Sequence, residues 1–221
     1  MSLKMYRLIL VLLILCSLIF LGSFRFASTH EPFSTIAKLS DNTDSIPVKL
    51  YPSKISEALR YCRKNKMDTC FAIFIDYSIH SGKKRAFLLD LQKDSITDSL
   101  LVSHGCGDMP WGWDYSKNNP QFSNDFESHR SSLGKFKIGA RGYSSWGINV
   151  KYILHGLEIT NSNALKRTIV MHGWGDVSDH EVYPNGTPEG WGCPAFSNSG
   201  MTKIDSILQN KKKAVLLWGF K

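Results

Sequence analysis

The sequence is short of cysteine and lacks the residue patterns that mark several common kinds of site. Five cysteines among 221 residues are too few for a fold built on disulfide bonds, so a hydrophobic core must hold the domain together. No cysteine pair is spaced as in a zinc knuckle, and no His-Glu-x-x-His helix motif occurs. A zinc site assembled from His104, His172, His180 and Cys193 stays an alternative, although the spacings match no closed structural pattern.

Acidic residues are fewer than basic ones, 19 against 27, and the formal net charge is +8. Three positive residues, Lys4, Arg7 and Arg25, lie in or beside an N-terminal apolar segment, and the others are thinly spread. The chain has no concentrated basic stripe and no recognisable nucleic-acid-binding module, so no nucleic-acid partner is expected. This charge balance suits a neighbourhood of anionic polymers or a membrane surface.

Apolar residues, by contrast, are plentiful: 43% of the chain is hydrophobic and 12% is aromatic, which is ample for a buried core. An almost unbroken apolar run, Leu8–Phe24, follows Lys4 and Arg7. Such a run is an export signal or a membrane anchor. We favour an uncleaved anchor, because no small-x-small cleavage site is clean. The positive residues would keep the short N-terminal side in the cytoplasm and place the domain outside.

Three regions follow from these patterns: a signal or anchor at residues 1–27, a polar linker at 28–50 and a domain at 51–221. In the domain, apolar residues at helical spacing predict two helices, at Ser53–Lys64 and Asn198–Gln209, and one helical turn at Asn163–Lys166. Short apolar segments between turn residues predict strands at Cys70–Tyr77, Arg85–Leu91, Ser99–His104, Lys135–Ile138, Gly147–Tyr152, Thr168–Met171 and Ala214–Trp218. Many short strands with few helices predict a mainly β domain, sandwich-like or barrel-like.

The most informative stretch is Val170–Ser197. It begins as a strand that runs into His172 and Gly173, continues as a long loop, and ends on Cys193 just ahead of the second predicted helix. A neutral imidazole beside a thiol can remove its proton and leave a thiolate, so the pair predicts a nucleophile and its base. The positive end of the helix and its free N–H groups would lower the pKa of the thiol and could hold an oxyanion. A catalytic Cys193 should then react faster than an ordinary exposed cysteine.

Other interpretations of the same residue types stay open. A buried cysteine and a hydrogen-bonded histidine are the structural alternative to the pair. Cys106 offers a second nucleophile, but the sequence after it cannot continue as the helix that normally presents one. Cys62 and Cys70 either form a disulfide or are two small buried residues. Tryptophans cluster in the predicted loops, at positions 111, 113, 146, 174 and 191, and are either a carbohydrate- or peptide-binding surface or loop packing.

Six short motifs follow one another between Phe71 and Trp218. They are Val102-Ser103-His104-Gly105, Phe122-Ser123-Asn124, Ser131-Ser132-Leu133-Gly134, His155-Gly156-Leu157-Glu158, Ile169-Val170-Met171-His172-Gly173 and Trp191-Gly192-Cys193-Pro194-Ala195. In this order they resemble the L,D-transpeptidase (YkuD-like) catalytic domain family, and more narrowly its murein L,D-transpeptidase branch. The family's base precedes its nucleophile, as His172 precedes Cys193. One departure is that Trp191 stands where most members have a second histidine.

The resemblance implies a β-sandwich with a few short helices that acts on peptidoglycan stem peptides, with no metal or organic cofactor. Cys193 would be the nucleophile and His172 the base, oriented by the backbone carbonyl of Gly173. Backbone N–H groups around Gly192 would hold the oxyanion. Further candidate substrate or oxyanion contacts are Trp191, His104 and Ser103.

The implied reaction is attack on the third stem residue with release of the terminal D-alanine. The thioester would then pass to an amine (transpeptidase) or to water (carboxypeptidase). A monomer on the periplasmic side of the inner membrane is expected, anchored by the N-terminal segment or secreted if that segment is cleaved. The competing class is a non-catalytic, peptidoglycan-binding envelope protein of the same fold.

Overall fold

The structure is a computed structural model that describes residues 51–221, so the anchor and linker predicted for residues 1–50 lie outside the described residues. In the described part, the helices are α2 (Pro52–Lys64), α3 (Asn198–Gln209) and the short 3-10 helix η1 (Ile159–Asn161). The strands are β1 (Phe71–Asp76), β2 (Ala86–Asp90), β3 (Ser95–Leu100), β4 (Gly134–Tyr143), β5 (Val150–Gly156), β6 (Val170–Gly173), β7 (Ala195–Phe196) and β8 (Leu216–Phe220). Neither α-helix among these residues has the length and apolar character needed to cross a bilayer.

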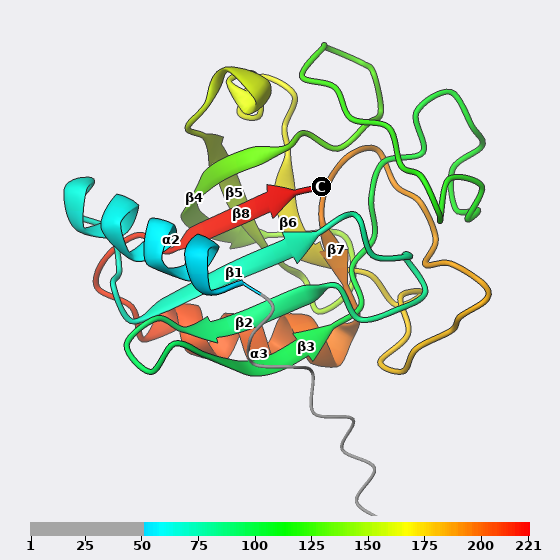
Figure 1. The fold of residues 1–221 in the computed structure, drawn as a ribbon. Coiled ribbons are helices and arrows are strands. Elements are labelled where there is room, and N and C mark those ends of the chain that lie inside the picture. The colour runs from blue at the N-terminus through cyan, green and yellow to red at the C-terminus, as the bar shows by residue number, and fades with distance from the viewer. Residues whose placement is uncertain (1–50) are drawn as a thin grey trace, which may run out of the picture. The chain divides into compact units, whose positions relative to one another are not determined.

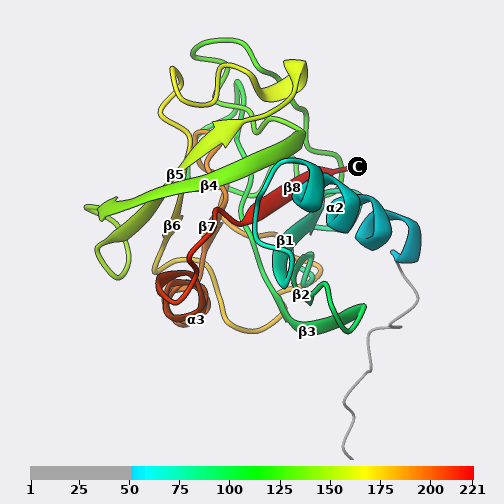
Figure 2. The ribbon, with the colours of Figure 1, turned by 90° about the vertical axis from the view of Figure 1, so that its left-hand side faces the viewer.

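The eight strands hydrogen bond into one sheet with the order β3-β2-β1-β8-β4-β5-β6-β7 (Figure 1). The pairs β1–β8 and β6–β7 are parallel and the others are antiparallel. In Figure 2, β4 and β5 run across the view while β1–β3 are seen nearly end-on, so the sheet twists strongly along its length. The predicted mainly β fold with a few short helices is therefore confirmed.

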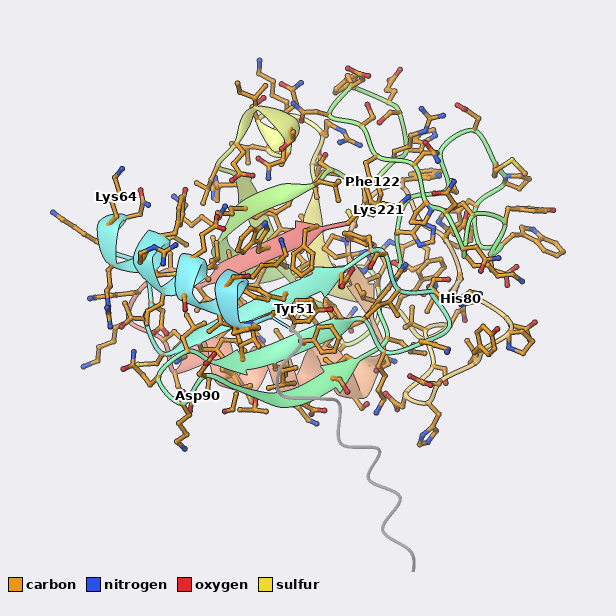
Figure 3. The ribbon with its side chains drawn as sticks, viewed as in Figure 1. Tyr51, Lys64, His80, Asp90, Phe122 and Lys221 are labelled. Atoms are coloured by element: carbon orange, nitrogen blue, oxygen red, sulfur yellow. The ribbon has the colours of Figure 1, made fainter. Side chains whose placement is uncertain are left out.

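The two α-helices cover opposite faces of the sheet (Figure 2). Alternate residues of β1 show why: Ile73 packs in the core that includes Met201 and Ile204 of α3, whereas Phe74 packs in the core that includes Ile55 of α2. Figure 3 shows Tyr51 at the start of α2, where its ring packs against the sheet beneath. Two apolar layers thus fix the sheet, and the site described below lies at its β6–β7 edge.

The predicted elements agree with the structure best where the apolar period is strong. Helix α3 has the predicted bounds, and α2 begins one residue before the predicted Ser53 because Pro52 occupies its first turn. The third strand is Ser95–Leu100 rather than Ser99–His104, since this edge strand is polar and partly exposed. The two-residue strand β7 was not predicted. Cys62 is buried, Cys70 is exposed, and both are free thiols.

Two long loops, the first at residues 101–133 between β3 and β4 and the second at residues 174–194 between β6 and β7, pack together at one end of the sheet, at the right of Figure 1. A parallel bridge joins Gly105 of the first loop to Gly190 of the second. Backbone hydrogen bonds tighten the contact: Cys106 N–H donates to the Gly190 carbonyl at 2.7 Å, and Glu189 N–H donates to the Trp113 carbonyl at 2.7 Å. The first loop therefore helps to hold the segment that precedes Cys193.

Candidate active site

Strand β6 directs His172 into a surface cleft. Side chains of a strand point alternately to its two faces, and here Met171 lies in the core while Val170 and His172 line the cleft. The imidazole Nδ1 donates to the carbonyl of Gly173 at 2.8 Å, which fixes the ring and leaves Nε2 as the acceptor. The predicted role of Gly173 in orienting the imidazole agrees with this geometry.

Cys193 reaches the same cleft from the neighbouring chain segment. Its Sγ accepts a hydrogen bond from Val170 N–H at 3.4 Å and lies 3.9 Å from the Thr168 carbonyl. Since Ala195 pairs with His172, Cys193 lies beside Val170, two positions from the imidazole, or about 7 Å along the strand. Among the described residues, no hydrogen bond joins Sγ to His172. The sequence predicted that the thiol lies at the N-terminus of a helix. This prediction is wrong, because strand β7 separates Cys193 from α3.

The protonation states of the two groups follow from their burial. Burial raises the pKa of the Cys193 thiol, and the Val170 N–H and the nearby charges of Arg167 and Lys151 only partly oppose this. Burial also lowers the pKa of His172, although its bond to Gly173 acts in the opposite direction. At neutral pH the resting pair is therefore a thiol and a neutral imidazole. The lowered thiol pKa expected from the sequence is wrong for this resting state, because no helix terminus offsets the burial.

This charge state predicts how Cys193 reacts with an alkylating reagent. Its reaction with iodoacetamide, followed by mass mapping, should have a pH midpoint above that of a short cysteine peptide, since a raised pKa means less thiolate. Replacing Arg167 by methionine should move the midpoint higher still, because the guanidinium favours the thiolate. Arg60→Met, at an exposed position, is the control and should leave the midpoint unchanged. A midpoint below that of the peptide would contradict the burial argument.

Gly192 gives the backbone before the thiol its shape. Its φ is +98°, and an added Cβ would lie 2.6 Å from the Arg130 carbonyl oxygen, so a side chain here meets both strain and a clash. The Gly192 carbonyl accepts from Ser131 Oγ at 3.1 Å. In the described part of the chain, the N–H groups of Gly192 and Cys193 donate to no other group. Two donors are thus available beside the thiol, as the oxyanion prediction requires.

Arg167 is the residue near the thiol that sequence reasoning missed. Its guanidinium donates to the Ser123 carbonyl at 2.8 Å, Ser132 Oγ at 2.7 Å and the Arg130 carbonyl at 2.5 Å. It therefore ties the 123–132 loop to the segment that carries Gly192, with Nη2 3.3 Å from where a Cβ of that glycine would lie. An arginine directly before the predicted strand Thr168–Met171 is the sequence signal that points to it.

His104 does not line the cleft, which corrects its prediction as a substrate contact. The side chain is fully buried and its Nδ1 accepts from Arg85 Nη2 at 2.8 Å. Its Nε2 is 2.8 Å from Ser116 Oγ and 3.5 Å from Glu189 Oε1. Burial lowers the pKa of His104. The ring thus acts inside the protein, joining the two long loops beneath the site.

Ser103 and Trp191 do line the cleft. Ser103 is buried, donates to the Cys193 carbonyl at 3.4 Å and accepts from Ala195 N–H at 3.1 Å, so it holds the backbone around the thiol. Trp191 is 62% exposed and stacks on His129 with ring centroids 5.3 Å apart. Cys106, the alternative nucleophile, is buried and not part of the lining.

The cleft has a volume of about 500 Å³. Its walls come from both long loops, the β4–β5 turn and strands β5 to β7. Among residues 51–221, no three His, Cys, Asp or Glu side chains come together as a metal site would need, and His180 is exposed elsewhere. The groups gathered in the cleft are instead a thiol and a neutral imidazole, and unpaired backbone N–H groups adjoin the thiol; these are the groups that covalent acyl transfer uses.

Fold and cleft together are those of a mainly β protein that presents an imidazole from strand β6 and a thiol from the segment just before the adjacent strand β7. The model of the L,D-transpeptidase catalytic domain family (YkuD_2) matches residues 43–218. The chain therefore belongs to the L,D-transpeptidase catalytic domain family, as the motifs predicted. A search of curated proteins gave no match.

Several solved structures are similar to the chain. The L,D-transpeptidase of Xylanimonas cellulosilytica is 11% identical, with 73% of this chain and 68% of that one covered and a TM-score of 0.38. Bd1075 of Bdellovibrio bacteriovorus is 12% identical over 71% and 49% of the two chains, with a TM-score of 0.42. The helical cell shape determining protein Pgp2 of Campylobacter jejuni is 12% identical over 69% and 48%, with a TM-score of 0.39. The chain thus spans about half the length of the last two.

Proposed function

We propose that this protein transfers the acyl group of peptidoglycan stem peptides through a thioester on Cys193, with His172 as general base. The observation that carries the proposal is the placement of thiol and imidazole in one cleft, with the unpaired N–H groups of Gly192 and Cys193 in the backbone that carries the thiol. Membership of the L,D-transpeptidase catalytic domain family supports the substrate class.

In the first half-reaction, His172 Nε2 takes the thiol proton as Sγ attacks the carbonyl carbon of the third stem residue. The N–H groups of Gly192 and Cys193 stabilise the negative oxygen of the tetrahedral intermediate. The intermediate collapses with cleavage of the C–N bond, and the imidazolium gives its proton to the departing D-alanine amine. A thioester and a neutral imidazole remain.

In the second half-reaction, an acceptor attacks the thioester while His172 takes its proton. An amine of another stem forms an amide cross-link, and water forms a carboxylate; in both cases the thiolate leaves and recovers a proton from the imidazolium. The hydrogen bond from Val170 N–H to Sγ favours the thiolate at this step. The neutral state of His172 suits the base role, because its lowered pKa keeps the imidazole unprotonated at neutral pH and somewhat below.

The setting remains part of the proposal. The predicted anchor at residues 1–27 would hold the domain on the periplasmic side of the inner membrane, where stem peptides are found. The domain is expected to act there as a monomer. Neither a metal nor an organic cofactor takes part in the proposed steps.

The test is to incubate the full-length protein with purified disaccharide-tetrapeptide and follow the products by mass spectrometry. Loss of one alanine indicates carboxypeptidase activity, and a cross-linked dimer that has lost one alanine indicates transpeptidase activity. The Cys106→Ala variant is a matched control and should keep full activity, since that thiol is buried away from the cleft. Absence of both products beside an active reference enzyme would contradict the proposal and leave the peptidoglycan-binding alternative, which pull-down on intact sacculi would examine.

A further inference from the structure

Three tryptophans from separate segments form one wall of the cleft. Trp111 stacks on Trp174 with ring centroids 5.0 Å apart and an interplanar angle of 18°. The ring centroid of Trp146 lies 5.7 Å from that of Trp111 and 6.1 Å from that of Trp174, and its ring plane is inclined to both. All three line the cleft that contains Cys193 and His172. We call these three residues the tryptophan wall.

Internal packing accounts for only one member of the wall. Trp174 is 4% exposed and packs with a small apolar cluster, and its Nε1–H donates to Asp176 at 3.0 Å. Trp111 and Trp146, by contrast, are 43% and 45% exposed. Large apolar side chains that remain exposed together at a cleft commonly mark a binding surface. The buried indole therefore supports two half-exposed ones, whose free surface is available to a ligand.

The wall lies at a defined place relative to the thiol. Val170, His172 and Trp174 follow one another on the cleft side of β6 and its extension, and Cys193 Sγ lies at Val170. Four residues of extended chain span about 13 Å. In a stem attacked at its third residue, two further residues lie between that residue and the sugar. The sugar is therefore three residue steps away, a span of about 10 Å. The wall is thus at the distance at which a sugar bearing the reacting stem would lie.

The chemistry of the wall also fits a sugar better than a peptide. Lys151, opposite His172 in the strand register, is the one permanently charged side chain among the described residues that line the cleft. A carboxylate-bearing stem peptide suits that cation. The wall itself carries no charge and is flanked by the hydroxyls of Ser144 and Ser145. A pyranose ring has an apolar C–H face for an indole and hydroxyl groups for such partners.

We infer that the tryptophan wall binds a pyranose ring of the glycan to which the stem peptide is attached, so that glycan-linked stems are preferred over free peptides. This inference rests on the proposed function for its reaction but not for its binding site. Trp111 and Trp146 act as specificity residues, and they hold the sugar while Lys151 faces the charged part of the stem.

The test compares two donors, disaccharide-tetrapeptide and the free tetrapeptide, with the full-length protein. Trp146→Ala should raise KM for the glycan-linked donor about tenfold, the usual scale for one well-placed aromatic contact, and leave kcat and the free peptide unaffected. Trp146→Phe should retain most of the preference. Trp113→Ala is the matched control, because this tryptophan is 60% exposed and outside the cleft lining; it should match the wild type. An equal loss for both donors, or no change for either, overturns the inference.

A second measurement separates this inference from the proposed function. Calorimetric titration of the wild type with a linear oligomer of N-acetylglucosamine should show saturable binding that Trp146→Ala weakens about tenfold. Such binding without turnover of either donor would refute the proposed function and support the sugar site. If the oligomer does not bind, or binds equally to Trp146→Ala, and the donor preference is also independent of Trp146, the sugar site is refuted.

Discussion

Replacing Cys193 by alanine is expected to abolish both D-alanine release and cross-linking, with a loss of rate of at least about 10⁴-fold. The reason is that, within residues 51–221, no other thiol reaches the cleft: Cys106 and Cys62 are buried elsewhere, and Cys70 is exposed but outside the lining. A loss of this size corresponds to about 5.5 kcal/mol of transition-state stabilisation. The measurement is the initial rate of alanine release, with the intact mass of the protein recorded during turnover.

The intact mass gives the prediction a second readout. The wild type should show a transient increase that corresponds to the thioester, and Cys193→Ala should show none. Cys106→Ala should behave as the wild type in both assays. An active Cys193→Ala together with an inactive Cys106→Ala would transfer the nucleophile to the first long loop. The unfolding midpoint of each variant checks that a loss of activity does not come from a loss of folded protein.

Replacing Arg85 by methionine is expected to destabilise the protein by about 3–5 kcal/mol, the usual cost of removing one partner from a buried set of charges. Arg85 is fully buried, and its guanidinium donates to the Val102 carbonyl at 2.9 Å and to His104 Nδ1 at 2.8 Å. Burial lowers its pKa to about 10, which still leaves it charged at neutral pH. Without this charge, the equally buried carboxylate of Glu189 loses its compensating cation.

Glu189 provides the means of testing the coupling. Its Oε1 accepts from Ser116 N–H at 2.6 Å, and its Oε2 has no hydrogen-bond partner within residues 51–221. The free energy of unfolding in urea should therefore fall less for Arg85→Met combined with Glu189→Gln than the two single changes add up to. Arg60→Met, an exposed substitution, should change stability by less than about 0.5 kcal/mol. Strict additivity of the two buried changes would show that the charges do not compensate each other.

How far the sequence predicts this structure depends on how local each signal is. Helix α3 was predicted with its observed bounds because Met201, Ile204 and Leu208 lie on one buried face. The His172–Cys193 pair was predicted because glycines stand beside both residues, His172 ends an apolar strand segment and Cys193 precedes a predicted helix. Strand β7 has only two residues, too few to show an alternating apolar pattern. Its pairing with β6 joins parts of the chain that are distant in the sequence.

The missed parts of the site arise from the tertiary structure. His104 ends the segment predicted as a strand, so the sequence suggested an open position, yet the two long loops close over it. The charge of Arg167 partly opposes the burial that raises the pKa of Cys193, because the fold brings the guanidinium close to the thiol. The same guanidinium holds the 123–132 loop beside Gly192. The tryptophan wall is a similar case, because its members are far apart in the sequence and only the fold stacks them.

The hydrogen bonds around Cys193 bear on the chemical durability of its sulfur. Oxidation to sulfenic acid proceeds through the thiolate and requires access by the oxidant. Sγ accepts from the Val170 N–H, lies near the Thr168 carbonyl, and has a raised pKa. We therefore expect the resting thiol to react slowly with peroxide and with disulfides at neutral pH. If the domain lies in the periplasm, as proposed, this raised pKa would help to keep the thiol reduced without a dedicated reductant.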